Sequence, residues 1–217
     1  MSHREEARTQ QDAVEEDAVT QDGRLHEDAV LLTPRLVMRP LLRHYVADLV
    51  DLYGDPAVTR FLKPLDHAGH LRRCEEAEEM WASRGFGRVA VHDRVDDRFL
   101  GRSGLQYWSH LGEVELTWAL RRDAWGNGYA TEAAAAWLAW ALRTRGLPYV
   151  TAMIDPQNTA SRAVAERVGM TVLRTDEQHG RPVIVYAAGV GGVDLPAEDR
   201  SAQQTNGPEN RGRGGTT

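Results

Sequence analysis

The stretch EVELTWALRRDAWGNGYAT, residues 113–131, decides the fold. Its first eight residues alternate between apolar side chains and polar or small ones, which predicts a strand with one apolar face over residues 113–120. After Gly126-Asn127-Gly128, apolar residues recur at helical spacing from Ala130 to Leu142. A strand that enters a helix through glycines directs free backbone N–H groups and the positive end of the helix dipole at one point. Phosphates bind at such points.

The glycine pair alone is also typical of an ordinary turn. Two other nucleotide sites fit poorly. A dinucleotide fingerprint needs a third glycine or alanine three residues after Gly128, where Thr131 stands, and an acidic residue at the ribose distance, which is absent. A Walker loop needs Gly-Lys-Ser/Thr, and the only lysine of the chain is Lys63.

Read with its neighbours, the segment 125–133 (WGNGYATEA) resembles the acetyl-CoA pyrophosphate loop of the GNAT N-acetyltransferase superfamily. Further segments are similar to its ribosomal-protein N-terminal-acetyltransferase-like (RimJ/RimL-like) branch. They are residues 33–41 (TPRLVMRPL), residues 99–101 (FLG), Asn158-x-x-Ser161 and Glu166-x-x-Gly169-Met170. The resemblance covers roughly residues 31–188.

The resemblance implies an α+β fold with a mixed central β-sheet flanked by helices. It also implies an enzyme that uses acetyl-CoA, without a metal, and transfers the acetyl group directly to a primary amine in a ternary complex. The acceptor would be a protein N-terminus or a small-molecule amine, and the protein a monomer or a homodimer. Substrate choice would lie between about Asp55 and His70.

Composition divides the chain into one domain and two tails. Residues 1–28 hold nine acidic residues against three arginines, and residues 190–217 hold four against three, so residues 29–189 are nearly neutral. Both tails lack the apolar content needed to offset chain entropy, and we expect them to be disordered, with a weak helix possible within residues 5–19. Residues 29–189 are expected to form the single GNAT domain.

The same composition excludes several classes of protein. The arginines are interspersed with acids, so nucleic-acid binding is not expected. No apolar run approaches the length of a membrane span, and the polar N-terminus has no secretory segment. The single cysteine excludes a disulfide framework, and a cytoplasmic location is expected.

The expected elements alternate as in the implied fold. They are a strand (31–39), helices (44–53 and 68–84) separated by a loop (61–69), strands (87–92, 99–108 and 113–120), a helix (128–144), a strand (149–154), a helix (158–168) and two strands (170–174 and 183–186).

By the resemblance, backbone groups hold most of the acetyl-CoA. Those of Trp118, Ala119 and Leu120 would pair with the pantetheine arm where two parallel strands splay apart. The pyrophosphate would bind the loop residues Trp125, Gly126, Asn127, Gly128, Tyr129, Ala130 and Thr131. The Trp125 side chain is more often packed than stacked on a ligand. Asn158 would touch the pantetheine arm, although capping the helix that follows would explain it equally well.

Two side chains are candidate catalytic groups. Glu115 would accept the proton of the amine through water, but it could also be an exposed strand carboxylate or part of a salt bridge, and Glu113 competes with it on the same face. Ser161 would protonate the leaving thiolate. Cys74 is expected at the surface of its helix or half-buried, not as a nucleophile. His67 and His70 are not expected on zinc; they would line the acceptor pocket or lie in solvent, and solvent is favoured.

Asp123 departs from the superfamily pattern, which places Gln or Arg at this position. An anion beside the pyrophosphate could weaken binding, and we expect Arg121 or Arg122 to offset it. Asp123 is the one support for an alternative function, a non-catalytic acyl-CoA-binding or regulatory module of the same fold.

Overall fold

The computed structural model describes residues 31–178 and 180–189. The two tails that we expect to be disordered, residues 1–28 and 190–217, lie outside these ranges, and so does the weak helix considered within residues 5–19.

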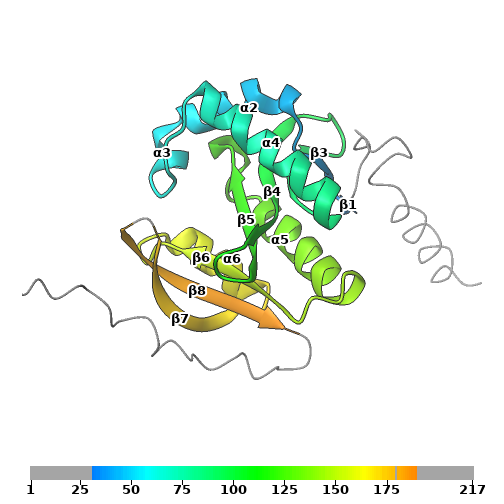
Figure 1. Ribbon diagram of the computed structural model, residues 1–217. Coiled ribbons are helices and arrows are strands. Elements are labelled where there is room, and N and C mark those ends of the chain that lie inside the picture. The colour runs from blue at the N-terminus through cyan, green and yellow to red at the C-terminus, as the bar shows by residue number, and fades with distance from the viewer. Residues whose placement is uncertain (1–30, 179, 190–217) are drawn as a thin grey trace, which may run out of the picture.

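One mixed sheet of eight strands forms the centre of the described residues (Figure 1). Its spatial order is β1-β2-β3-β4-β5-β6-β8-β7. The strands are β1 (Leu31–Leu32), β2 (Leu36–Pro40), β3 (Arg88–Asp93), β4 (Phe99–Trp108), β5 (Glu113–Leu120), β6 (Tyr149–Ile154), β7 (Thr171–Gln178) and β8 (Arg181–Gly189). Neighbouring strands are antiparallel except β5 and β6, which are parallel. The α+β fold with a mixed sheet is therefore confirmed.

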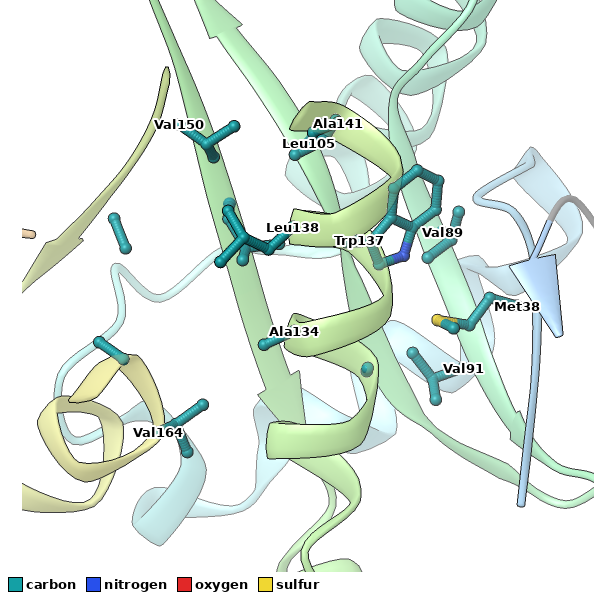
Figure 2. Close-up of a cluster of buried hydrophobic side chains, with 14 of the residues drawn as sticks. Met38, Val89, Val91, Leu105, Ala134, Trp137, Leu138, Ala141, Val150 and Val164 are labelled. Carbon is teal, nitrogen blue, oxygen red and sulfur yellow. The ribbon is translucent and has the colours of Figure 1, made fainter. Parts of the chain in front are cut away.

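Helices cover both faces of the sheet. They are η1 (Arg43–Tyr45), α2 (Val46–Gly54), α3 (Pro56–Thr59), α4 (His67–Arg84), η2 (Arg122–Ala124), α5 (Tyr129–Ala139), the π-helical turn η3 (Trp140–Thr144) and α6 (Thr159–Arg167). Successive side chains of β3 point to opposite faces of the sheet, so their neighbours show which helices cover each face. Val89 and Val91 belong to the same core as Trp137 of α5 and Val164 of α6 (Figure 2). Ala90, between them in the strand, belongs to the core that contains residues of α2 and α4. The α5 and α6 helices thus lie on one face, and α2 and α4 on the other.

The α5 face holds the larger hydrophobic core. Trp137 is 1% exposed and points from α5 toward the sheet (Figure 2). Truncation of a tryptophan buried in this way to alanine costs about 3–5 kcal/mol. This core fixes α5 against β4 and β5, and it thereby fixes where the helix begins, at the glycine loop.

Some expected boundaries are wrong. The strand expected over residues 31–39 is two strands, because Thr33 and Leu36 close a turn: the Thr33 amide donates to the Leu36 carbonyl, and the Leu36 amide donates to Oγ1 of Thr33, both at 3.0 Å. The helix α3 was missed, although Asp55 caps it by accepting a 2.8 Å bond from the Ala57 amide. The last two strands extend further than expected, to Gln178 and Gly189.

The expectation of one apolar face on β5 is incomplete. Leu116 and Leu120 do pack in the α5 core. The opposite face is covered as well, and Glu113 and Glu115 on it are only 6% and 7% exposed. Arg174 of β7 binds Glu113, and Trp108 of β4 and Met153 of β6 bind Glu115, so these two polar residues of the alternation are buried too.

Candidate active site

The parallel strands β5 and β6 separate almost as soon as they meet. Glu115 and Thr151 form their only pair of partnered residues. The Arg121 amide donates to the Leu100 carbonyl of β4, and backbone groups alternate in direction along a strand. Ala119 therefore directs its backbone groups toward β4, whereas Trp118 and Leu120 direct theirs into the gap beside β6. Two of the three strand residues predicted to bind the pantetheine arm thus face this fork.

Glu115 lies at the base of the fork. Its Oε1 atom accepts a bond of 3.3 Å from the Met153 amide of β6, and its Oε2 atom accepts one of 2.7 Å from Nε1 of Trp108. Burial raises the pKa of the Glu115 carboxyl, against the opposing effect of these two bonds and of Arg88 and Arg102. The interpretation as an exposed carboxylate is therefore wrong, and a carboxylate with a raised pKa is a better proton acceptor near neutral pH.

Glu113, the competing carboxylate, is engaged elsewhere. Its two oxygens accept bonds of 2.9 Å from both terminal nitrogens of Arg174 on β7. The pair is buried, with 7% of the Glu113 side chain and 10% of the Arg174 side chain exposed. A carboxylate held in this bidentate pair is not free to take a proton from a substrate.

The glycine loop presents open backbone at the start of α5. Gly126 and Gly128 have φ angles of +78° and +79°, which other residues rarely adopt. A Cβ atom added to Gly126 would meet nothing within 4 Å. The amides of Tyr129, Ala130 and Thr131 open the helix, where amides have no partner within the helix itself. The loop geometry therefore fits an anion.

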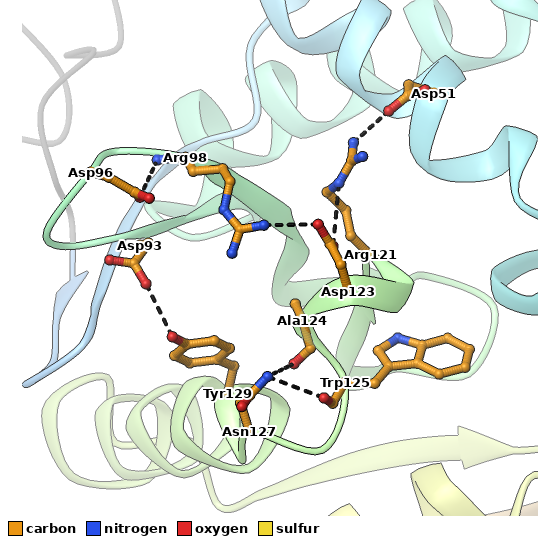
Figure 3. A network of polar contacts seen from close by, with 10 residues as sticks. All are labelled: Asp51, Asp93, Asp96, Arg98, Arg121, Asp123, Ala124, Trp125, Asn127 and Tyr129. Atoms are coloured by element: carbon orange, nitrogen blue, oxygen red, sulfur yellow. Dashed lines mark hydrogen bonds and ion pairs between the residues drawn. The ribbon is translucent and has the colours of Figure 1, made fainter.

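The side chains of the loop are held by hydrogen bonds to neighbouring groups of the protein. The Tyr129 hydroxyl donates to Asp93 at 3.0 Å, and Nδ2 of Asn127 donates to the Trp125 carbonyl at 3.1 Å (Figure 3). Trp125 donates from Nε1 to the Leu120 carbonyl at 2.8 Å, yet remains 48% exposed. It is thus anchored at one edge, with much of the ring open to a ligand.

Two residues that sequence reasoning did not single out hold the loop in place. Arg35, in the β1–β2 turn, donates to the Asn127 carbonyl at 2.8 Å and to Oε2 of Glu132 at 2.6 Å. Glu132, in the first turn of α5, also accepts a 2.6 Å bond from the Thr33 hydroxyl. The signal was present, because Thr33 and Arg35 belong to one of the segments that carry the family resemblance.

Asp123 is neutralised by its neighbours. Arg98 donates to Oδ2 of Asp123 at 2.8 Å, and Nε of Arg121 lies 3.6 Å from Oδ1 (Figure 3). Arg121 also pairs with Asp51 of α2. Arg121 is one of the two residues expected to offset Asp123, and Arg98 was not foreseen. The one support for a non-catalytic module is thereby weakened.

A cavity of about 950 Å³ opens beside the start of the loop. Its wall is formed by α2, α3 and the residues that follow β5, among them Asp55, Val58, Arg121 and Asp123. The cavity reaches Asp55 and Val58 at α3, which lie within the range expected to choose the substrate, residues 55–70.

Asn158 and Ser161 stand at the start of α6. Oδ1 of Asn158 accepts a 3.1 Å bond from the Ser161 amide, so the capping role is confirmed. Val164 and Ala165 pack α6 into the α5 core. The helix that carries Ser161 and the carboxylate of Glu115 therefore lie on opposite faces of the sheet, with the fork between them.

Two expectations for α4 are wrong. Cys74 is fully buried, and burial raises the pKa of its thiol to about 11, which rules out a thiolate nucleophile near neutral pH. His70 is also fully buried, not in solvent, because it faces the sheet one turn before Cys74. His67 is exposed as expected.

Within residues 31–178 and 180–189, no three His, Cys, Asp or Glu side chains gather as metal ligands would. A search of these same residues finds no helix of the length and apolarity that a bilayer crossing requires.

Comparison with known proteins gives consistent matches. Residues 35–171 match the family model described as acetyltransferase (GNAT) domain. The chain is 31% identical over 161 residues to the uncharacterized protein YkkB of Bacillus subtilis (strain 168), covering 72% of this chain and 93% of that one. It resembles a crystal structure of an acetyltransferase from Agrobacterium tumefaciens str. C58 at 29% identity and a TM-score of 0.66, over 73% of this chain and 92% of the other.

The fold is also similar to that of RimL, a ribosomal L7/L12 α-N-protein acetyltransferase solved with coenzyme A. The identity is 15% and the TM-score 0.63, over 75% of this chain and 98% of the other. At this identity the likeness concerns the fold alone.

Proposed function

The chain belongs to the GNAT acetyltransferase family, and we propose that it transfers the acetyl group of acetyl-CoA directly to a primary amine within a ternary complex. It is an acetyl-CoA-dependent N-acetyltransferase by family. The observation that carries the proposal is the fork between β5 and β6, which opens beside the glycine loop and has Glu115 at its base.

Acetyl-CoA, when bound, supplies an activated acetyl group. We assign its pyrophosphate to the backbone amides of residues 125–131, and its pantetheine arm to the backbone of Trp118 and Leu120 and to Asn158. The loop suits this role because its amides and the helix dipole act together on an anion. Ala119 is not assigned to the pantetheine arm, because its backbone groups face β4.

Three groups of the chain would then act on the reaction. A backbone amide in the fork, that of Trp118, stabilises the negative charge that develops on the carbonyl oxygen. Glu115 accepts the proton of the amine through water, which leaves the nitrogen able to attack. Ser161, approaching from the opposite face, provides a proton to the leaving thiolate. Fixing both substrates at the fork supplies much of the remaining rate.

We assign the chain to the RimJ/RimL-like branch, on the segments at residues 33–41 and 158–170 and on the likeness of fold to RimL. The acceptor is accordingly a protein N-terminus or a small-molecule amine. Cytoplasmic acetyl-CoA is its donor, and the protein acts as a monomer or homodimer without a metal.

Initial-rate kinetics test the proposal. Thiol release is measured with acetyl-CoA and an amine varied together. Direct transfer in a ternary complex predicts intersecting lines in double-reciprocal plots. Parallel lines would indicate an acyl-enzyme and would overturn direct transfer.

A further inference from the structure

A group of basic side chains is buried on the α2/α4 face of the sheet. Arg88 on β3 and Arg102 on β4 come from the sheet, and His70 and Arg73 come from α4. Tyr53 of α2 lies among them: its hydroxyl accepts a 2.8 Å bond from Nε of Arg102, and the Arg73 guanidinium lies 4.7 Å from its ring centroid. We refer to these five residues as the basic cluster.

The basic cluster adjoins the proposed site of transfer. Nη1 of Arg102 donates to Oγ1 of Thr117 at 3.2 Å. Thr117 and Glu115 are two residues apart on β5, so their side chains share a face and stand about 7 Å apart along the strand. Arg88 and Arg102 are also close enough to lower the pKa of the Glu115 carboxyl. A molecule whose amine is near Glu115 therefore places its other groups within reach of the cluster.

The positive charge of the three arginines exceeds the negative charge beside them, which comes from Glu115 and Glu76. Arg88 reaches one carboxylate, that of Glu76, at 3.5 Å, and the Glu76 side chain is 61% exposed. Burial, and next the positive charge of Arg102, lower the pKa of Arg73 to about 10. The arginines of the cluster therefore lie close enough to repel one another. Buried charge without a counter-charge is costly.

Several buried nitrogen atoms in the cluster also lack a partner. Burial lowers the pKa of His70 to about 4, so its neutral ring offers one donor and one acceptor, and the charge of the cluster comes from its arginines. Both ring nitrogens of His70, Nη1 of Arg73 and Nε of Arg88 are buried without a hydrogen bond in the part of the chain that the structure describes. His70 is 0% exposed. Buried polar atoms in native proteins nearly always have a partner, and an absent ion or ligand is one reason why they do not.

We propose that the basic cluster binds an anionic group of the amine acceptor, a carboxylate or a phosphate, and that the preferred acceptors are small amines that carry such a group. The inference rests on the proposed function, because it places the acceptor beside Glu115. Guanidinium groups suit both anions, since their planar N–H donors match pairs of oxygen atoms. The Arg88 side chain is 12% exposed and Arg73 is partly exposed, so the cluster borders solvent at these two residues.

Matched acceptors test the inference on the full chain. Thiol release is measured at saturating acetyl-CoA and constant ionic strength with O-phosphoethanolamine, β-alanine and ethanolamine. We expect kcat/KM for at least one of the two anionic amines to exceed that for ethanolamine about tenfold or more, the effect of a hydrogen bond to a charged group. Preference for O-phosphoethanolamine would identify phosphate as the anion, and preference for β-alanine would identify carboxylate.

Variants then assign the effect to the cluster. Arg73→Gln is expected to reduce the preference about tenfold through KM for the acceptor, with kcat and KM for acetyl-CoA retained. Arg72→Gln is the matched control, because Arg72 is the exposed neighbour on α4, and the preference should stay unchanged. Equal or better turnover of ethanolamine, or equal effects of the two variants, would overturn the inference.

A binding measurement separates this inference from the proposed function. If none of the three amines is acetylated, the melting temperature is measured with each. Stabilisation by an anionic amine that Arg73→Gln abolishes would support the cluster as an anion site while counting against transfer. Absence of stabilisation by both anionic amines would overturn the inference.

Discussion

The backbone amide of Met153 donates a 3.3 Å hydrogen bond to Oε1 of Glu115, at the point where β5 and β6 diverge. Thr151, two residues earlier on β6, pairs with Glu115, so alternation directs the Met153 amide toward β5 as well. The carboxylate takes the place that a backbone carbonyl of β5 would have in a continuous ladder. Glu115 therefore both holds the fork open and stands beside the proposed site of transfer.

Replacing Glu115 tests its role as proton acceptor. The pKa of Glu115 is raised by burial, so as pH falls through this raised value the carboxylate is protonated and can no longer accept a proton. The acid limb of the wild-type pH–rate profile should therefore have its midpoint above pH ~4.3, the ordinary pKa of a glutamate side chain. Glu115→Gln should lower kcat/KM by about 10²–10⁴-fold and abolish this acid limb. A pH–rate profile of the variant that keeps the limb would remove Glu115 from the proton transfer.

Replacing Gly128 tests the loop. Valine at a φ of +79° is strained by about 1–2 kcal/mol and would add bulk where the pyrophosphate is proposed to bind. We expect Gly128→Val to raise the Kd for acetyl-CoA at least tenfold, measured by calorimetry. Gly146→Val is the control, since Gly146 has a φ of +64° and open space around it but lies beyond the far end of α5. Both variants should melt earlier, and equal affinities for acetyl-CoA would refute the loop assignment.

The contacts of Arg35 give a third prediction. Its guanidinium holds the Asn127 carbonyl and Glu132, so Arg35→Met should loosen the loop and raise the Kd for acetyl-CoA about tenfold, the effect of losing a charged hydrogen bond. Arg39→Met is the control, because Arg39 pairs with Asp97, in the β3–β4 turn. If both variants bind acetyl-CoA equally, Arg35 has no part in positioning the loop.

The Glu113–Arg174 pair is expected to serve stability. Glu113→Ala removes the buried carboxylate that binds both terminal nitrogens of Arg174 and leaves Asp176, 3.3 Å from Nε, to balance the guanidinium, so it should lower the free energy of unfolding by up to about 3 kcal/mol. Adding Arg174→Met removes the stranded charge and should recover part of the loss. Chemical denaturation of the three proteins measures this, and a double variant no more stable than Glu113→Ala would contradict the account.

Local patterns sufficed to predict much of the fold. The boundaries of β4, β5 and β6 follow from alternating or β-branched sequence, and α6 follows from the Asn158 cap. The break between β1 and β2 was not predicted, although the Thr33–Leu36 turn that makes it is local. The Thr33 and Arg35 side chains in this turn also bind Glu132, about a hundred residues away in the chain, and that contact could not be predicted from local patterns.

The site was predicted less completely than the fold. The glycine loop could be predicted from the sequence because positive φ angles favour glycine. The burial of Glu115 and His70 could not be predicted, since it depends on contacts with distant segments: Glu115 with Trp108 and Met153, and His70 with Tyr53. The basic cluster likewise combines residues of four separate segments, and nothing in the spacing of Arg73, Arg88 and Arg102 brings them together.

The most direct test of the central claim is a calorimetric titration of the full chain with acetyl-CoA and, in parallel, with NAD and ATP. We predict saturable binding of acetyl-CoA at one site, much weaker binding of NAD and ATP, and loss of the acetyl-CoA signal in Gly128→Val. Failure of acetyl-CoA to bind, or binding that Gly128→Val leaves unchanged, would contradict the assignment of the loop and the fork to this co-substrate.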